Sequence, residues 1–527
     1  MIKLKAHKHR SKPDKLSCVL VMVLLLSSCG AKRDIIDLSP EYNPEKLIVP
    51  RDFRGQSPFK IATPSENTYS GEWWKLFNDP ELDQLQKKLY ESNPTLQAAG
   101  ERFVQSRYEM MKARSMYLPH LGIKGFYDQN QRSSDDLMHG QVNELALGNT
   151  SSFMGPLSWE PDIWSKYRNA TNIRVFQAQA SAANYGAIRL LLQAELAANY
   201  YTLRALDAKN SVYFQSIAYY KKALDMVTIQ FNGNLASSLD VARAKFLLTS
   251  TESKQLDVEA ERQVVEQSIA ALVNVSPSTF RIKPVSTFSI PKMTIPKVLP
   301  ADLLERRPDI AALERKMAQA NKSIGIARAA FFPDINLNGS SSLFLIAKIS
   351  NPVWAFGSIL DYNIFESGYR RAQLQRSWSV YRETLNQYRE GVLTAFKEVE
   401  HGLSKTNLID KSLGRQKEAV AAAFHMQELT MDLFRGKLAS SLDLLYAELK
   451  TLEARIHEVE IKMNLMVSTV HLVKALGGGW EQKNQMPQDK QIPAFGLFQY
   501  TKLGEIKPVV DIGKSDPENQ VNLIGGY

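Results

Sequence analysis

The sequence contains two tandem copies of one unit. Residues 233–240 recur at 436–443, 203 residues further on, with seven of eight positions identical. Two other pairs of segments match in the same order and at similar offsets, 117–121 with 331–335 and 163–168 with 364–370. These matches indicate a duplication with a unit of about 200 residues, so we expect the chain to fold as two similar halves.

Each half contains a very long helical segment. Residues 165–231 include no proline, and apolar residues recur there every three or four positions, as on one face of a helix. At a rise of 1.5 Å per residue, such a helix is about 100 Å long. The second half repeats the pattern at 369–434, turns at Gly436 and returns through a heptad pattern at 449–473, which predicts packing between the helices. No compact domain needs helices of this length.

Short stretches of alternating apolar and polar residues precede each long helix. They follow shorter helical segments, 80–116 and 301–330, that end near a proline. Alternation over about ten residues is typical of strands that cross an outer membrane. We predict two strands in each half, at 121–127, 153–159, 335–339 and 354–364.

Four strands are too few to form a pore within one chain. In lipid, every unpaired N–H or C=O group on an open sheet edge costs several kcal/mol, so a spanning sheet must close into a barrel. Two chains would supply 8 strands and three chains 12, both even numbers as outer membrane barrels require. We therefore expect a mainly α fold with a transmembrane β-barrel that is shared between chains, above a hollow cylinder of long helices.

The N-terminus has the layout of an exported lipoprotein. Six basic residues and one aspartate precede an apolar run at 16–26, which is too short to span a membrane. The run ends in Leu26-Ser27-Ser28-Cys29, which resembles the lipobox where a signal peptidase cuts before a lipid-modified cysteine. We predict that residues 1–28 are removed and that acyl chains on Cys29 hold the protein on a membrane. The alternative is an ordinary signal peptide, with Cys29 as an incidental thiol.

Composition and motifs argue against several other functions. The net charge is +10, but half of this excess lies in the first fifteen residues, so the remainder is too small to indicate nucleic acid binding. The mature chain has no His-x-x-x-His pair and no cysteine besides Cys29, so we predict no metal site. Gly513-Lys514-Ser515 lacks the first glycine of a phosphate-binding loop, because position 508 is Pro508. We expect no enzymatic activity and no cofactor apart from the lipid on Cys29.

We predict five segments along the chain. They are a lipoprotein signal peptide at 1–28, a linker at 29–79, a first repeat at 80–290, a second repeat at 291–480 and an irregular tail at 481–527.

Several long motifs resemble one family. They occur in order at 73–80, 158–164, 303–310, 329–333 and 476–480. These motifs are similar to those of the TolC-like outer membrane factors of tripartite efflux and secretion systems, in particular their lipoprotein branch. The resemblance implies a homotrimer with a 12-stranded barrel in the outer membrane, an α-helical tunnel of 12 helices in the periplasm and an equatorial region built from the terminal segments. It also implies that substrate arrives from an inner-membrane pump through a periplasmic adaptor (membrane fusion) protein.

The resemblance also suggests where the tunnel closes. Family members narrow it at the far ends of the long helices, often with a ring of acids, and Asp443 and its duplicate Asp240 match that position. One turn further on, where relatives can carry another acid, this chain has Tyr446 and Arg243. The simpler interpretation is helix capping, with Ser237 and Ser440 as N-caps and each Asp near the positive end of the new helix. Both roles are compatible. If the adaptor docks as the resemblance implies, it would contact the turns at Gly233, Leu235, Gly436 and Leu438. The simpler interpretation is that these turns face solvent.

The favoured function is a passive trimeric exit duct for small molecules or drugs in the outer membrane. One alternative within the same family is an exit duct for type I polypeptide secretion. A different class of protein, a periplasmic coiled-coil lipoprotein scaffold without a pore, would share the long helices but would not need the four alternating strands.

Overall fold

The computed structural model describes residues 36–42, 72–131, 147–291, 307–346, 349–436 and 438–478. The predicted signal peptide, Cys29 and the tail at 481–527 lie outside the described residues, as does most of the linker at 29–79.

The two halves have the same order of elements and nearly identical helix lengths. The first half contains α4 (Lys166–Asn232), of 67 residues, followed by α5 (Ser238–Leu272), of 35 residues. The second half contains α8 (Tyr369–Arg435) and α9 (Ser441–Ala475), which have the same lengths of 67 and 35 residues. Both long helices and the internal duplication are confirmed.

The first helical segment is two helices instead of one. Helix α2 (Pro80–Ser92) ends at Asn93, and α3 (Pro94–Ser115) begins directly after it. The Asn93 side chain accepts the backbone N–H of Leu96 at 2.9 Å and donates to the carbonyl of Leu272, at the end of α5, at 2.8 Å. A proline at the first helical position and an N-cap Asn start a new helix, so the apolar period continues across a break in the backbone.

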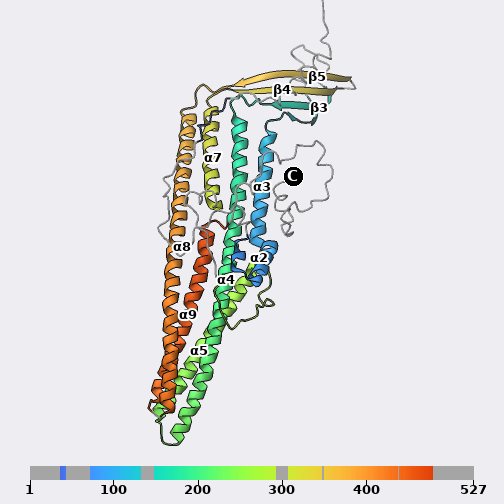
Figure 1. Cartoon of the computed structure of the whole chain (residues 1–527). Coiled ribbons are helices and arrows are strands. Elements are labelled where there is room, and N and C mark those ends of the chain that lie inside the picture. The colour runs from blue at the N-terminus through green and yellow to red at the C-terminus, as the bar shows by residue number, and fades with distance from the viewer. Residues whose placement is uncertain are drawn as a thin grey trace, which may run out of the picture.

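The helices form one elongated layer (Figure 1). In the lower half the packing order is α5, α4, α9, α8; in the upper half it is α3, α4, α7 (Pro308–Ala329), α8. The buried positions of α9 include Leu452, Val459, Met466, Val470 and Val473, which all belong to the predicted heptad pattern. The turns that join α4 to α5 and α8 to α9 lie together at the end opposite the sheet (Figure 1).

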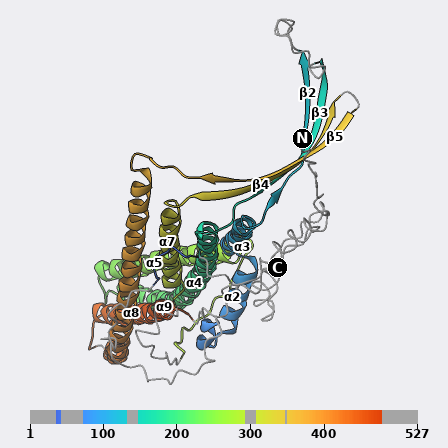
Figure 2. The same cartoon turned by 90° about the horizontal axis from the view of Figure 1, so that it is seen from above.

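The strands form one antiparallel sheet at the upper end. The order is β1 (His120–Leu121) and β2 (Lys124–Gln131) on one edge, then β3 (Leu147–Trp159), β4 (Asp334–Ile346) and β5 (Ile349–Asp361). Figure 2 shows that the sheet curves away from the helices. Within the described residues the sheet is open, since neither β1–β2 nor β5 has a partner on its outer side.

β1 and β2 together form one edge strand with a local interruption. We call this interrupted strand, and each of the strands β3, β4 and β5, an arm of the sheet. Both pair with β3 in the same register, and Gly122, which lies between them, is opposite Pro156. The N–H of Gly122 donates to the carbonyl of Pro156 at 2.9 Å, but Pro156 has no N–H to return the second hydrogen bond. The described sheet therefore has four arms, as predicted.

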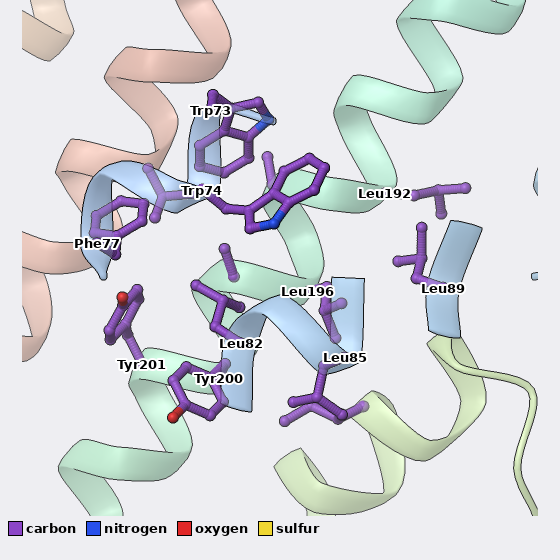
Figure 3. Close-up of a cluster of buried hydrophobic side chains, with 14 of the residues drawn as sticks. Trp73, Trp74, Phe77, Leu82, Leu85, Leu89, Leu192, Leu196, Tyr200 and Tyr201 are labelled. Carbon is purple, nitrogen blue, oxygen red and sulfur yellow. The ribbon is translucent and has the colours of Figure 1, made fainter. Parts of the chain in front are cut away.

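A buried aromatic cluster holds the N-terminal elements on the first long helix (Figure 3). The short 3-10 helix η2 (Trp73–Phe77) inserts Trp73, Trp74 and Phe77 between α2 and α4. Trp73 is 1% exposed, and its indole N–H donates to Gln193 at 3.3 Å. Gly478, just after α9, has φ +56, and a Cβ there would lie 2.2 Å from Leu190 Cδ1 and 3.2 Å from Trp73. Glycine is therefore required where the end of the second half meets this cluster.

Candidate functional site

The two turns at the tip share a C-cap glycine and a backbone hydrogen bond across the turn. Gly233 and Gly436 are the C-cap residues, and the N–H groups of Leu235 and Leu438 donate to carbonyls of the preceding helix at 2.8 Å. The left-handed residue of the first turn is Asn234, with φ 55, whereas Gly233 has φ −87. The first turn is therefore a Schellman ending. Leu235 and Leu438 are 82% and 80% exposed, so two apolar side chains project from the tip.

Both candidate gate acids cap helices. The side chain of Ser237 accepts the N–H of Asp240 at 3.2 Å, and the Asp240 carboxylate accepts the N–H of Ser237 at 3.1 Å. Asp443 makes the same capping box with Ser440 at 3.2 and 2.9 Å. Hydrogen bonds from Ser237 and Ser440 hold the pKa values of Asp240 and Asp443 below the ordinary range. The predicted capping role is confirmed, and both carboxylates remain on the surface of the single chain.

The residues one turn further on have local partners. Arg243 lies 3.7 Å from Asp240 in an ion pair. Tyr446 is exposed, and the ammonium of Lys450 lies 5.6 Å from its ring centroid. The structure thus places all four gate candidates in the first two turns of α5 and α9, at the tip (Figure 1).

Sequence reasoning missed a buried acid just above the tip. Glu448 of α9 is 4% exposed, accepts a hydrogen bond from Gln427 of α8 and faces Tyr219 and Tyr220 of α4. Burial raises the pKa of Glu448 to about 7, and Ser216, Arg455 and Gln427 oppose this shift only in part. Its position four residues after Leu444 and four before Leu452 marks it as a charged residue on the buried stripe, a signal that the sequence contains.

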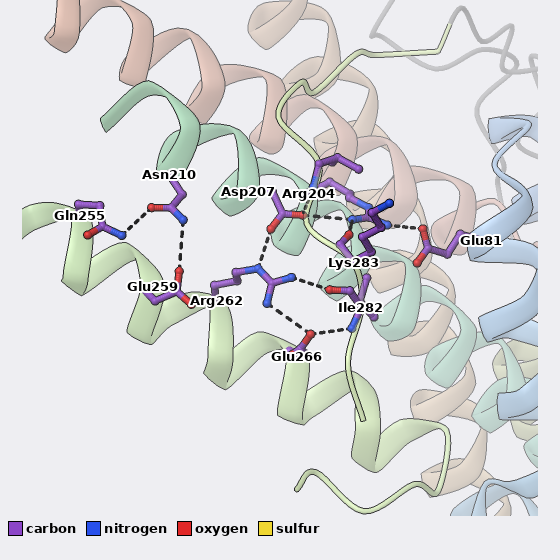
Figure 4. Close-up of polar contacts among 11 residues, drawn as sticks. Glu81, Arg204, Asp207, Asn210, Gln255, Glu259, Arg262, Glu266, Ile282 and Lys283 are labelled. Atoms are coloured by element: carbon purple, nitrogen blue, oxygen red, sulfur yellow. Dashed lines mark hydrogen bonds and ion pairs between the residues drawn. The ribbon is translucent and has the colours of Figure 1, made fainter. Parts of the chain in front are cut away.

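A second missed cluster ties the connection between the halves to the helices (Figure 4). Asp207 of α4 accepts hydrogen bonds from Arg262 of α5 at 2.6 Å and from Arg204 at 3.1 Å. The two arginines also donate to the carbonyls of Ile282 and Lys283 at 2.8 Å. Because each buried charge is paired and hydrogen-bonded, the cluster holds the connecting segment in place without leaving an orphaned ion.

The sheet has one apolar face. The register places Trp354, Phe356 and Leu360 of β5 on the same side as Leu157 and Trp159 of β3. Further exposed apolar residues on this side are Leu121, Tyr127 and Phe153. Among the described side chains, the opposite side carries mostly small or polar residues, including Ser158, Asn336, Asn338, Ser340 and Gly357, with Phe126, Met154 and Ile359 as exceptions. An exposed apolar face of this extent indicates a surface that meets lipid.

A short N-terminal segment is docked near the base of the sheet. Asp37 accepts from Lys322 of α7 at 2.9 Å and from Asn169 of α4 at 3.3 Å. Burial opposes ionisation, but Lys322 and Ser39 outweigh it and hold the pKa of Asp37 at about 2. A Cβ at Gly325 would lie 3.0 Å from Ser39, so the segment crosses α7 where that helix has no side chain.

The described ranges contain neither a helix suited to cross a membrane nor a cluster of metal ligands. None of the helices there combines the length and the apolar character that a membrane crossing requires. No group of three or more His, Cys, Asp or Glu side chains in the described part of the chain is arranged to hold a metal ion.

Comparison with known proteins identifies the family. The family model described as outer membrane efflux protein matches residues 85–275 and 299–478, which is more than half of the chain. The chain belongs to the outer membrane efflux protein family. It is therefore an outer membrane channel of the TolC-like type that works in efflux and extends into the periplasm, and it is a transport protein. Family membership decides against the scaffold without a pore.

The matches to individual relatives extend over almost the whole length of each relative. The pyoverdine export outer membrane protein OpmQ of Pseudomonas aeruginosa is 27% identical over 471 residues, covering 88% of this chain and 96% of OpmQ. The toluene efflux pump outer membrane protein TtgC of Pseudomonas putida is 26% identical over 484 residues, covering 90% of this chain and 97% of TtgC. The solved structure of the outer-membrane channel OprN superposes with a TM-score of 0.76 at 22% identity, covering 84% of this chain and 99% of OprN. The mainly α fold with an antiparallel sheet is that of this efflux family.

Proposed function

We propose that three copies of the chain form the exit duct of a tripartite efflux system. The observation that carries the proposal is the open sheet with one apolar face at the end of long helices. Three copies supply twelve arms, which close a barrel with its apolar face toward lipid, while α4, α5, α8 and α9 of each copy enclose a periplasmic tunnel.

The N-terminal lipid is proposed to anchor the duct. Cys29 lies eight residues before Asp37, a reach of at most about 28 Å for an extended chain. Asp37 itself is held by Lys322 and Asn169, close to the ends of α7 and α4 that meet the sheet. Acyl chains on Cys29 can therefore enter the periplasmic leaflet beside the barrel.

The tip is proposed to be both gate and docking site. Asp240 and Asp443 from three copies would form acidic rings at the periplasmic entrance, with Tyr446 and Arg243 narrowing the next turn. The exposed Leu235 and Leu438 offer apolar contacts to the helical hairpin of a periplasmic adaptor, which links the duct to an inner-membrane pump.

Small molecules are the proposed cargo. The relatives named above are described for pyoverdine export and for toluene efflux, two chemically different small molecules. Such variety at similar identity supports a passive duct whose cargo is chosen by the pump, rather than type I polypeptide secretion.

Two measurements test this function. In planar bilayers, the detergent-solubilised protein is expected to give discrete conductance steps and to migrate as a trimer that dissociates on heating. A deletion strain is expected to become susceptible to dyes and antibiotics, and wild type should restore resistance. A monomeric particle without conductance, or a deletion that impairs only polypeptide secretion, would contradict the proposal.

A further inference from the structure

The duplication suggests how neighbouring copies contact one another. Within one chain, the first half's corner between β3 and α4 packs on the second half's corner between α7 and β4. Trp164 stacks on Phe332 with ring centroids 4.5 Å apart and an interplanar angle of 22°. The indole N–H of Trp164 donates to the carbonyl of Pro333 at 2.9 Å.

The duplicate partners of this contact are exposed. Phe365, in the corner between β5 and α8, matches Trp164 and is 83% exposed. Leu118 and Pro119, in the corner between α3 and β1, match Phe332 and Pro333, and Leu118 is 50% exposed. Phe365 is at one end of the open sheet and Leu118 at the other, so within the described chain they do not meet.

We propose that Phe365 of one copy packs on Leu118 and Pro119 of the next, and that β5 pairs with the neighbour's β1–β2 arm with Ser358 opposite Gly125 and Leu360 opposite Ile123. The register is the β3–β4 register transferred to the duplicate positions. Leu157 is opposite Gly339 and Trp159 opposite Leu337, and these four residues match Ser358, Gly125, Leu360 and Ile123 in that order. The proposal rests on the oligomeric duct proposed above and specifies its interface.

The direction of the free backbone groups supports this register independently. In an antiparallel ladder, a residue directs both its N–H and its C=O to the same neighbouring strand, and the next residue directs them to the other side. The hydrogen bond from Gly122 to Pro156 shows that even-numbered residues of the first arm bond to β3. Ile123 and Gly125 therefore direct their backbone groups to the free edge.

The alternation of hydrogen-bonding directions continues across the sheet to β5. Because Pro156 bonds to the first arm, Leu157 bonds to Gly339 of β4, and Asn338 then bonds to Gly357 of β5. Ser358 and Leu360 consequently direct their backbone groups to the outer edge. The transferred register thus joins residues whose hydrogen-bonding groups are free on both sides.

The apolar face gives a third check. Leu360 lies on the apolar side of the sheet, and Ile123, between β1 and β2, falls on that side because Leu121 and Gly125 flank it in one register. The proposed register keeps this side continuous across the junction, whereas a shift by one residue would turn the neighbour's apolar side inward. The contact is head-to-tail, and such contacts form a ring when the rotation between copies closes, as the proposed barrel of twelve arms requires.

Cysteine crosslinking in the full-length chain tests the register. The double variant Gly125→Cys with Ser358→Cys is expected to form a disulfide-linked ring after mild oxidation, seen as a trimer band on a non-reducing denaturing gel. The same-face control, Tyr127→Cys with Ser358→Cys, moves one partner by two residues. It should crosslink at least about tenfold more slowly, because a disulfide needs Cα atoms 4.4–6.8 Å apart. The parent chain and each single variant control for Cys18 and Cys29.

The outcomes separate this inference from the proposed function. A monomeric parent by light scattering in detergent would overturn both. A trimeric parent in which the Tyr127 pair crosslinks as fast as the Gly125 pair would overturn the register and leave the duct intact. If the Gly125 variant does not accumulate, the pair Ile123→Cys with Leu360→Cys tests the same register, and failure of that pair to crosslink in a trimer contradicts it.

Discussion

At the scale of single residues, the tip acids combine a local and a collective role. Asp443 completes a capping box with Ser440, which accounts for its position without any reference to a pore. Capping depends on hydrogen bonds that Ser440 also makes, whereas a gate depends on the charge of Asp443 alone. The two roles can therefore be separated by substituting the two partners in turn.

Asp443→Ala is expected to raise the conductance of the isolated trimer, since it removes both the cap and one ring of negative charge. Ser440→Ala removes the cap and keeps the charge, so its conductance should stay near that of wild type. Single-channel recordings in planar bilayers make the comparison. Equal conductance for Asp443→Ala and wild type would leave Asp443 with capping alone.

The buried Glu448 makes stability depend on pH. Its pKa is raised from the ordinary 4.5 to about 7, so the folded chain holds a proton that the unfolded chain loses above pH 4.5. The contribution of the protonated Glu448 to the free energy of unfolding is therefore fully present below pH 4.5, and it is lost as the pH rises through about 7. The full loss is about 3 kcal/mol per chain.

Glu448→Gln is expected to remove most of this pH dependence, because the amide stays neutral. Thermal unfolding of wild type should begin at lower temperature at pH 7.5 than at pH 5, while the variant changes much less. Circular dichroism melts at both pH values test this. A variant that keeps the wild-type slope would show that other groups set the pH dependence.

At the scale of elements, glycines in α8 distinguish close packing from open surface. A Cβ at Gly402 would lie 3.0 Å from Leu472 Cδ1 and 3.5 Å from Leu472 Cα of α9, whereas a Cβ at Gly414 meets nothing within 4 Å. Gly402 thus permits the close approach of α8 and α9. At Gly414 no neighbouring atom requires a glycine.

Alanine substitutions at Gly414 and Gly402 are expected to change the free energy of unfolding in opposite directions. Gly414→Ala should stabilise the protein by about 1 kcal/mol, because alanine has the higher helix propensity. Gly402→Ala should destabilise it, since the new methyl group forces Leu472 or the helix to move. Denaturant melts of both variants provide the measurement, and stabilisation by Gly402→Ala would contradict the packing described for this helix pair.

At the scale of the whole molecule, the described part of a single chain leaves sheet edges unpaired and apolar surface exposed. In the described part of the chain, the sheet has two free edges and a broad apolar face, and the longest helices are much longer than a compact core requires. In the proposed trimer, neighbouring copies would pair these edges and pack these helices together. The stability of the assembly should therefore respond to substitutions that leave the single chain nearly unchanged.

Phe365→Ala is expected to lower the temperature at which the trimer dissociates on a denaturing gel, because it removes the aromatic side chain from the junction. Phe365→Trp should retain or raise that temperature, since an indole N–H could donate to the carbonyl of Pro119 as Trp164 does to Pro333. Unchanged dissociation of the alanine variant would argue that Phe365 does not lie in the interface.

Local patterns in the sequence predicted the elements. The two 67-residue helices, the strand arms and the N-caps at Ser237 and Ser440 are encoded by periodicity and by residues a few positions apart. The duplication predicted two similar halves for the same reason, since similar local patterns form similar elements. The family resemblance rested on contiguous motifs.

Tertiary structure alone decided which elements meet. The break at Asn93, the burial of Glu448 and the charge cluster around Asp207 depend on partners tens to hundreds of residues away, which no local period specifies. The order of the strands and their register were likewise absent from the sequence pattern. Alternation states which side chains share a face but not which strand lies beside it, because that choice is made by long-range packing and hydrogen bonding.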